Sequence, residues 1–261
     1  MNGRTLADTF RYLEREEPDR TALYTVLAPI YEAIYATDDR IDGQFETVAT
    51  TTPPDATTVL EVGCGTGALL ARLEAAFEQT VGADVSPQMA RRARDRARTE
   101  VVVGSVSALR PRSVDLITMM GAVLGHVRPD MNARALVSDA YERLRPGGRI
   151  VCSVHDRAAL ADLVSRELTT ETSGYRVLQR DRQHPTGGGM FNWNVEYTLT
   201  ERESGRSVSV EQQVPIRAFG REELADWFRT AGFQDVETSD REFVAEERRS
   251  RAFVITASTM G

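Results

Sequence analysis

A glycine-rich stretch that follows an apolar run sets the strongest constraint on how this chain folds. Residues 59–70 read VLEVGCGTGALL, with glycine at positions 63, 65 and 67. Because glycine has no Cβ, such a backbone reaches positive φ angles and can approach a ligand closely. The run before the glycines predicts a strand, and the residues after them predict a helix whose first N–H groups face polar ligand atoms. The stretch therefore predicts a site for a nucleotide-like ligand, at the turn where doubly wound sheets bind them.

Short apolar runs and helical segments alternate from Thr57 to Asp156. This alternation predicts right-handed strand–helix–strand crossovers and a parallel sheet covered on both faces. The turn at 145–148, Arg-Pro-Gly-Gly, leads into the last of these strands. The expected strands are 57–62, 79–83, 101–103, 114–119 and 149–154, and the expected helices are 67–76, 87–98 and 130–144.

The pattern changes on either side of this unit. The first fifty residues are mostly helical in pattern, with a new helix expected at Pro29. Residues 191–199 carry apolar side chains at every second position, and Val208, Val210, Val214 and Ile216 continue that period. This predicts two long antiparallel strands that interrupt the α/β unit. A helix at 221–230 and strands at 233–237 and 251–257 are expected to close the fold, whereas QHPTGGG around His184 is expected to be a loop.

Composition excludes several classes of protein. The 261 residues carry a formal net charge of −7, which argues against general affinity for nucleic acid. The arginines at 91–98 spread around a helix and favour a solvated surface over an RNA-binding patch. No apolar run approaches the roughly 18 residues that span a bilayer, and the first twenty residues lack a signal-type apolar segment. We therefore expect a cytoplasmic protein without membrane contact.

The cysteines and histidines do not suggest a metal site or a disulfide. Cys64 lies in the glycine turn and Cys152 in an expected strand, and both are expected to be buried thiols. The three histidines, His126, His155 and His184, are dispersed without the spacing of metal ligands.

An acidic residue at the end of the second expected strand fits the same ligand. Asp84 stands about 20 residues after the glycine turn, where a carboxylate accepts hydrogen bonds from the two hydroxyls of a ribose. The alternative is that Asp84 caps the helix that begins at Pro87. Both NAD and adenosyl cofactors carry this ribose, so these two positions leave the choice between them open.

Five motifs in order resemble those of the class I S-adenosylmethionine-dependent methyltransferases. They are EVGCGTG at 61–67, GADVSPQMARRAR at 82–94, Gly-Ser-Val at 104–106, SVDLI at 113–117 and LRPGGR at 144–149. The family usually has Asp where this chain has Ser105, so a hydroxyl or backbone group replaces that carboxylate here. The resemblance implies a Rossmann-like α/β fold with a mostly parallel seven-stranded sheet, and S-adenosylmethionine as the cofactor. It implies cofactor contacts from Glu61, Gly63, Cys64, Gly65, Gly67, Asp84, Val85, Met89, Ser105, Val106 and Met120.

A second resemblance is carried by residues 31–35 (YEAIY), Gly125-His126, the hairpin after the fifth strand and residues 219–224 (FGREEL). These segments are similar to small-molecule N-methyltransferases, namely those acting on nucleotide-linked amino sugars and the glycine/sarcosine type. This resemblance implies an N-terminal helical lid at 1–50 and a methyltransferase domain at 51–261, with an antiparallel hairpin insertion at about 170–218. The N-terminal aromatics pack on the domain, close the site as a lid, or do both. A homodimer is also an expectation.

The same resemblance suggests residues for the acceptor. Tyr31 resembles the family tyrosine that closes over the cofactor or acceptor. His126 follows the fourth strand, at the edge where the site forms, and is the candidate base or orienting group. His155 and Asp156 follow the fifth strand and are weaker candidates, and Arg217 is a candidate for an anionic group of the acceptor.

The chain is thus expected to be an enzyme that transfers a methyl group from S-adenosylmethionine to a small molecule, most simply at nitrogen. One alternative is a regulatory protein that binds the cofactor without catalysis. A less favoured alternative is a nicotinamide-dependent dehydrogenase, which shares the glycine turn but not the later motifs.

Overall fold

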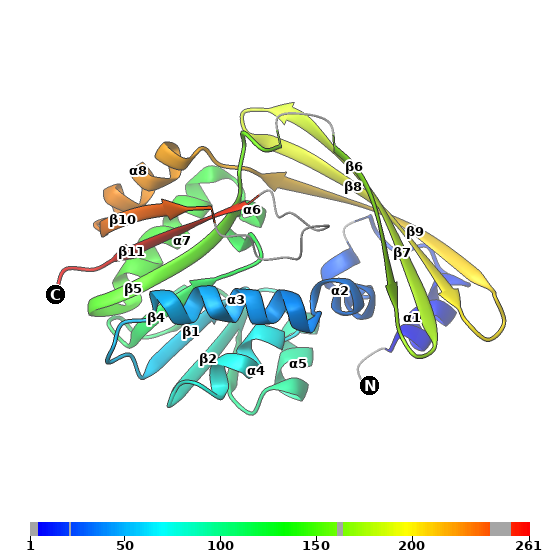
Figure 1. Cartoon of the computed structure of the whole chain (residues 1–261), viewed down its shortest axis with the longest axis horizontal. Coiled ribbons are helices and arrows are strands. Elements are labelled where there is room, and N and C mark those ends of the chain that lie inside the picture. Colours follow the sequence, from blue (N-terminus) through cyan, green and yellow to red (C-terminus); the bar gives the residue numbers. More distant parts are fainter. Residues whose placement is uncertain (1–4, 21, 161–163, 241–251) are drawn as a thin grey trace.

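A mixed sheet forms the centre of the larger part of the molecule (Figure 1). The computed structural model describes residues 5–20, 22–160, 164–240 and 252–261. Its strands run in the order β10-β11-β5-β4-β1-β2-β3. The five from β5 to β3 are parallel, and β11 pairs antiparallel with both β5 and β10. This confirms the expected, mostly parallel seven-stranded sheet. The strands are β1 (Thr58–Val62), β2 (Gln79–Asp84), β3 (Glu100–Val103), β4 (Val114–Met119), β5 (Leu144–His155), β10 (Gln234–Ser239) and β11 (Ala252–Ser258).

Helices cover both faces of this sheet, as the crossovers require. Figure 1 shows α3, α4 and α5 along one face and α7 and α8 along the other. All five residues of β1 are buried, which is expected for a central strand covered on both sides. The covering helices are α3 (Asp38–Thr51), α4 (Ala68–Glu74), α5 (Pro87–Arg96), α7 (Asp130–Arg143) and α8 (Arg221–Ala231), with short turns at α6 (Val123–His126) and η2 (Val106–Ala108).

The turn expected before the fifth strand is part of that strand. The pairing of β4 with β5 shifts from Val114 opposite Leu144 to Leu116 opposite Arg149, so the Pro-Gly-Gly segment forms an irregularity within β5. Gly147 adopts a φ of 76° there, which favours glycine over any other residue. Arg251, expected to begin the closing strand, lies outside the described residues.

A second, four-stranded antiparallel sheet rises from the end of β5 and arches away from the first (Figure 1). The two strands expected from the alternating pattern are confirmed as β8 and β9. Two further strands pair beside them, and the prediction of a loop around His184 is wrong, because that residue lies on β7. The strands are β6 (Val164–Glu171), β7 (Tyr175–Gly187), β8 (Met190–Glu201) and β9 (Ser207–Arg217).

The N-terminal segment is helical, as predicted, and packs on the inner face of this second sheet. Pro29 stands in the first turn of α2, as expected. A shared apolar cluster joins these helices to β8 and β9, with Leu23, Ile30, Tyr197 and Leu199 at its centre. The helices are α1 (Leu6–Leu13), η1 (Ala22–Tyr24) and α2 (Ala28–Tyr35). The division into a lid at 1–50 and a domain at 51–261 stays a prediction.

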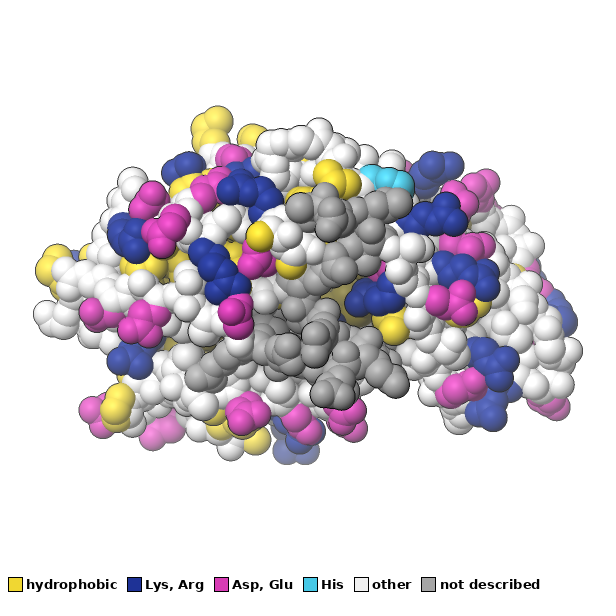
Figure 2. All heavy atoms as spheres, turned by 45° about the horizontal axis from the view of Figure 1, so that its top comes forward, with side chains coloured by type: hydrophobic (Ala, Val, Ile, Leu, Met, Phe, Trp, Pro, Cys, Tyr) yellow, Lys and Arg dark blue, Asp and Glu magenta, His cyan; other side chains and the backbone are white. Residues whose placement is uncertain are grey.

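The surface charge, the helices and the two cysteines were compared with what the composition predicts. Arginine and acidic side chains are intermixed over the face shown in Figure 2. Within the described ranges, no helix combines the length and the apolar character needed to cross a bilayer. Cys64 and Cys152 are both buried and unpaired, as predicted.

Candidate functional site

A cavity of about 790 Å³ lies between the carboxyl ends of the parallel strands, the N-terminal helices and the second sheet. This volume falls within the roughly 300–1,000 Å³ typical of small-molecule sites. Most residues that the sequence assigned to the site line this cavity. They are Tyr31, Gly63, Gly65, Asp84, Val85, Met89, Ser105, Met120 and His126.

The glycine turn forms one wall of the cavity. Gly63 has a φ of +68°, and a Cβ there would lie 2.5 Å from a methyl group of Val123. Gly65 has a φ of +54°, and a Cβ there would meet nothing nearer than the Tyr31 ring at 3.8 Å. The first glycine is therefore required by packing against α6, while the second leaves open space beside Tyr31.

Two other members of the turn face the protein instead of the cavity. A Cβ on Gly67 would lie 2.8 Å from the Cα of Ala93, so this glycine permits close packing of α5. Cys64 is buried, and its sulfur lies 3.1 Å from the position a Cβ would take on Gly82. Burial raises the pKa of the Cys64 thiol. Neither residue lines the cavity, because Gly63 and Gly65 occupy the side of the turn that faces the cavity, while Cys64 and Gly67 face the packed protein interior.

Asp84 ends β2 and holds the turn in place. Its carboxylate accepts hydrogen bonds from the backbone N–H groups of Gly65 and Ser86, each at 2.8 Å. The cap of α5 is Ser86, whose hydroxyl accepts from the N–H of Met89. The alternative assignment of Asp84 as the helix cap is therefore wrong. Burial raises the pKa of Asp84, and the two N–H donors oppose that rise.

Glu61 lies beneath the turn with a polar atom unsatisfied. It is 5% exposed, and within the described part of the chain its Oε2 has no hydrogen-bond partner. Burial, followed by the charge of Asp84, raises the pKa of Glu61 well above its usual range. Such a carboxyl is stabilised by a cationic ligand group. Val106, also implied by the resemblance, is fully buried in η2 and does not line the cavity.

A row of aromatic side chains forms the opposite wall. Tyr24 and Tyr31 have ring centroids 5.6 Å apart, and Tyr31 and Tyr35 are 5.0 Å apart. Tyr35 then meets Trp193 of β8 edge to face at 6.1 Å. At the other end of the row, the hydroxyl of Tyr24 lies 3.4 Å from the Nε2 of His126. The row thus joins the N-terminal helices to α6 at one end and to the second sheet at the other.

Polar contacts hold the N-terminal helices over the turn. The hydroxyl of Ser86 donates to the carbonyl of Tyr24 at 2.6 Å. Glu32 of α2 forms ion pairs with Arg92 and Arg96 of α5. These contacts place η1 and α2 next to the end of β2. This position favours the expectation that the N-terminal aromatics both pack on the domain and cover the site as a lid.

Two histidines line the cavity from neighbouring strand ends. His126 ends α6 and His155 ends β5. Burial lowers the pKa of each to about 4, with Arg128 adding to the effect at His126, and His126, Arg40 and Arg166 adding to it at His155. Both imidazoles are therefore neutral at pH 7.

This burial predicts a loss of stability in acid. An unfolded histidine binds a proton near pH 6.5, whereas the folded pKa values are about 4. Because the unfolded state binds more protons between these values, the free energy of unfolding should fall as pH drops from 7 toward 4, by about 2 kcal/mol per histidine at pH 5. Urea unfolding at several pH values checks this. The double variant H126Q/H155Q should lose less stability over that range, and an equal loss would contradict the buried, neutral state.

Two other sequence candidates, Asp156 and Arg217, lie away from the cavity. Arg217 forms ion pairs with Glu223 and Asp130, so its assignment to an acceptor anion is not supported. Asp156 pairs with Arg221. His184 is exposed on β7.

Sequence reasoning missed several lining residues. Arg40 of α3 lies 5.6 Å from the centre of the Tyr35 ring, and its charge lowers the pKa of Tyr31 and His155. Arg166 and Trp193 come from the second sheet. No motif marks them, because they reach the cavity only through the packing of distant segments. In the described ranges, no three His, Cys, Asp or Glu side chains gather as a metal site would require.

Comparisons with known proteins agree with this architecture. Residues 59–148 match a family profile described as a methyltransferase domain, and a search of curated proteins finds no match. An S-adenosylmethionine-bound amino pentose methyltransferase from Micromonospora echinaspora superposes with a TM-score of 0.73 and 20% identity, over 88% of this chain and 97% of that one. DesVI of Streptomyces venezuelae superposes with a TM-score of 0.73 and 22% sequence identity, over 94% of this chain and 100% of that one. A sugar N-methyltransferase from Streptoalloteichus superposes with a TM-score of 0.71 and 20% sequence identity, over 89% of this chain and 92% of that one.

These structural likenesses lie below 25% identity and establish the fold. The profile match covers the segment that carries the glycine turn, Asp84 and His126. Residues 59–148 thus match the profile of a methyltransferase domain, and the chain as a whole has the fold of these S-adenosylmethionine-dependent methyltransferase structures.

Proposed function

We propose that this protein transfers a methyl group from S-adenosylmethionine to a nitrogen atom of a small molecule. The observation that carries the proposal is one continuous cavity that joins the glycine turn and Asp84 to the tyrosines and histidines. The sulfonium supplies an already activated methyl group. The protein's part is to align the acceptor in line with that bond and to exclude water, which contributes on the order of 7–11 kcal/mol.

We assign the cofactor to the half of the cavity beside the glycine turn. Asp84 is placed to accept hydrogen bonds from ribose hydroxyls while it braces Gly65. Glu61, with its unsatisfied buried oxygen, suits the α-amino group. We assign the adenine ring to the part of the cavity beyond Asp84, which is lined by Val85, Met89 and Ser105.

Arg40 is the residue we assign to the cofactor's carboxylate. It lies at the start of α3 and lines the cavity. Its charge lowers the pKa of Tyr24 and Tyr31, whereas the charge of Asp84 raises the pKa of the same two residues, so both charges lie near these tyrosines. Within the described ranges, no ion pair joins it to a carboxylate. A guanidinium suits a carboxylate ligand because its N–H groups match the two oxygens.

Substitution of this arginine gives a selective test. The R40M variant should bind S-adenosylhomocysteine about tenfold or more weakly, since a charge-assisted pair contributes about 1.5–3 kcal/mol. It should bind 5′-methylthioadenosine, which lacks the amino-acid group, as well as the wild type does. Calorimetry measures both. R72M, at an exposed position of α4, is the matched control. Equal weakening of both ligands would contradict the assignment.

The acceptor half holds the tyrosine row and the two neutral histidines. A neutral His126 can accept a hydrogen bond from the acceptor nitrogen and orient its lone pair, while a pKa of about 4 makes it a weak base. Tyr31 lies between the two halves. Two of the structural neighbours are an amino pentose methyltransferase and a sugar N-methyltransferase, which supports an amine of amino-sugar type as the acceptor.

Incubation with methyl-labelled cofactor and a panel of amines, alcohols and thiols tests the function. We expect label in amines and stoichiometric S-adenosylhomocysteine. Binding of the cofactor without transfer to any acceptor would favour a regulatory protein instead. NADH binding without affinity for S-adenosylhomocysteine would favour a dehydrogenase.

A cytoplasmic location and a homodimer remain predictions from the sequence. Sedimentation of the purified protein would determine its oligomeric state.

A further inference from the structure

A glutamine occupies a position of α3 where packing favours an apolar side chain. Ile41, Gln44 and Val48 are buried at intervals of three and four residues, so they lie on one face of the helix. Ile41 and Val48 pack in an apolar cluster with Met120, which directly follows β4. A polar side chain in the middle of such a face needs a partner, because burial without a hydrogen bond costs free energy.

The amide of Gln44 has no such partner within the protein. The residue is 8% exposed, and in the described part of the chain no group forms a hydrogen bond with its amide. Gln44 lines the cavity, as Arg40 does one helical turn earlier. Buried amides are normally hydrogen-bonded, so an amide that lines a cavity without a protein partner points to a group of the ligand.

Gln44 lies next to the strand ends where the two halves of the cavity meet. A Cβ on Gly121 would lie 4.0 Å from the Nε2 of Gln44, and Gly121 comes two residues after the end of β4. In the sheet, β4 lies between β1, which leads into the glycine turn, and β5, which ends at His155. Gln44 is therefore on the acceptor side of the glycine turn, whereas Asp84 ends β2 on the other side.

The backbone N–H groups beside Gln44 are used within the protein. The hydroxyl of Ser153 accepts hydrogen bonds from the N–H of Gly121 at 2.9 Å and from that of Ala122 at 3.4 Å. These two donors fix the turn after β4 and are not directed to a ligand. The amide of Gln44 is thus the group beside this turn that has hydrogen-bonding capacity left for a ligand.

We propose that Gln44 binds the nitrogen atom that receives the methyl group. Its Oε1 accepts a hydrogen bond from an N–H of the acceptor amine, which leaves the nitrogen lone pair directed to the sulfonium. The lone pair forms the new N–C bond while the S–C bond breaks and its electrons stay on sulfur. The methylated ammonium then gives a proton to water.

This contact favours the transition state over the bound amine. The nitrogen gains positive charge as the N–C bond forms, so its hydrogen bond to Oε1 becomes charge-assisted and stronger. The inference rests on the proposed function and adds a contact residue for the acceptor nitrogen to it.

Sinefungin tests the contact without an acceptor. It has an amine-bearing carbon in place of the methyl-bearing sulfur, so its amine lies where the methyl group is transferred, whereas S-adenosylhomocysteine has no group there. Q44M removes the amide and keeps the length of the side chain. This variant should bind sinefungin at least tenfold more weakly, because a hydrogen bond to a charged group is lost, and S-adenosylhomocysteine within twofold of the wild type. Calorimetry measures both dissociation constants.

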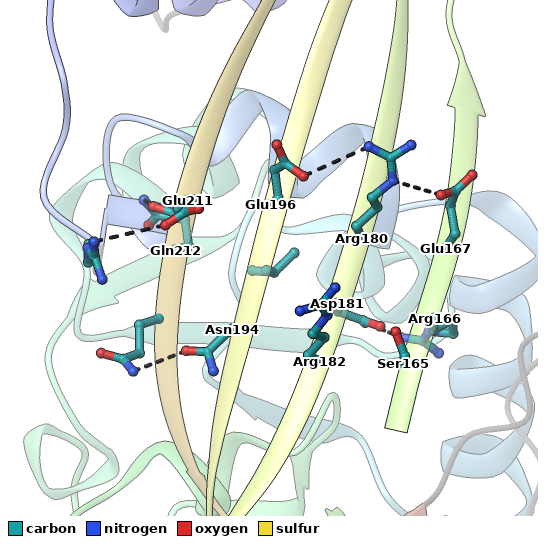
Figure 3. A pocket seen from close by; sticks show the side chains of 13 residues that line it. Ser165, Arg166, Glu167, Arg180, Asp181, Arg182, Asn194, Glu196, Glu211 and Gln212 are labelled. Carbon is teal, nitrogen blue, oxygen red and sulfur yellow. Dashed lines mark hydrogen bonds and ion pairs between the residues drawn. The ribbon is translucent and has the colours of Figure 1, made fainter. Parts of the chain in front are cut away.

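Three further variants separate this contact from a general effect on the site. Q44E keeps an acceptor oxygen and should bind sinefungin at least as tightly as the wild type. Q213M should change neither dissociation constant, because Gln213 lies outside the cavity and donates at 3.0 Å to Asn194 of the second sheet (Figure 3). R40M should weaken both ligands alike, since both carry the carboxylate that we assign to Arg40.

Turnover extends the test to the reaction itself. For an amine that the panel identifies as an acceptor, Q44M should lower kcat at least tenfold and leave the KM for S-adenosylmethionine within threefold of the wild type. An unchanged kcat would contradict the contact with the reacting nitrogen.

Two binding results would also overturn the proposal. One is equal weakening of sinefungin and S-adenosylhomocysteine in Q44M, which would assign Gln44 to the amino-acid end of the cofactor or to the fold. The other is no weakening of either ligand. Failure of the proposed function is distinct. If the wild type binds no S-adenosylhomocysteine, both proposals are wrong; if it binds both ligands but methylates no amine, the sinefungin titration still decides whether Gln44 faces the position of transfer.

Discussion

Replacement of Asp84 by alanine should weaken the binding of S-adenosylhomocysteine on the order of 100-fold. The carboxylate is placed to accept from two ribose hydroxyls, and hydrogen bonds to a charged group contribute about 1.5–3 kcal/mol each. It also accepts from the N–H groups of Gly65 and Ser86, so its removal loosens the turn that faces the ligand. Calorimetric titration measures the dissociation constant.

The control for this variant is D95A, because Asp95 is exposed on α5 and does not line the cavity. It should leave the dissociation constant within twofold of the wild type. Circular dichroism and the melting temperature show whether D84A remains folded. A folded D84A protein that binds as tightly as the wild type would remove Asp84 from the ribose role.

The G65A variant should fold and lose most of its affinity for the cofactor. A Cβ at this position meets only Tyr31, at 3.8 Å, so no protein atom is displaced. The methyl group would instead occupy the space between the turn and the tyrosine, which we assign to the cofactor. The φ of +54° adds a strain of roughly 1–2 kcal/mol. We expect at least a 30-fold rise in the dissociation constant, measured by calorimetry.

Gly205 offers a matched control for the strain. It has a φ of +72° in the turn between β8 and β9, and a Cβ there would meet nothing within 4 Å. G205A should therefore lose a similar amount of stability in urea unfolding and keep its affinity for S-adenosylhomocysteine. If both variants bound equally well, the space beside Gly65 would not be the cofactor site.

The central strands of the first sheet were predictable because they are buried on both faces and are therefore largely apolar, as β1 and β4 are. The β8 and β9 strands were predictable because apolar residues alternate with polar ones. The β6 and β7 strands were missed because the side of this sheet that faces the cavity carries Arg166, Gln179, Asp181 and Gln183, so polar residues occupy both faces.

Within the site, the sequence predicted residues that belong to a local motif. Gly65 and Asp84 stand at fixed distances along the chain from a strand end, and both line the cavity. Gly67 belongs to the same motif but serves the packing of α5. Arg40 and Arg166 carry no local signal, because the distance of each from the cofactor depends on how the N-terminal helices and the second sheet close over the first.

The most direct test of the account is a calorimetric titration of the wild-type protein with S-adenosylhomocysteine, repeated with NADH. The account predicts saturable binding of one S-adenosylhomocysteine per chain and no heat of binding with NADH. Binding of NADH in the absence of any binding of S-adenosylhomocysteine would contradict the claim that the glycine turn and Asp84 hold an adenosyl amino acid.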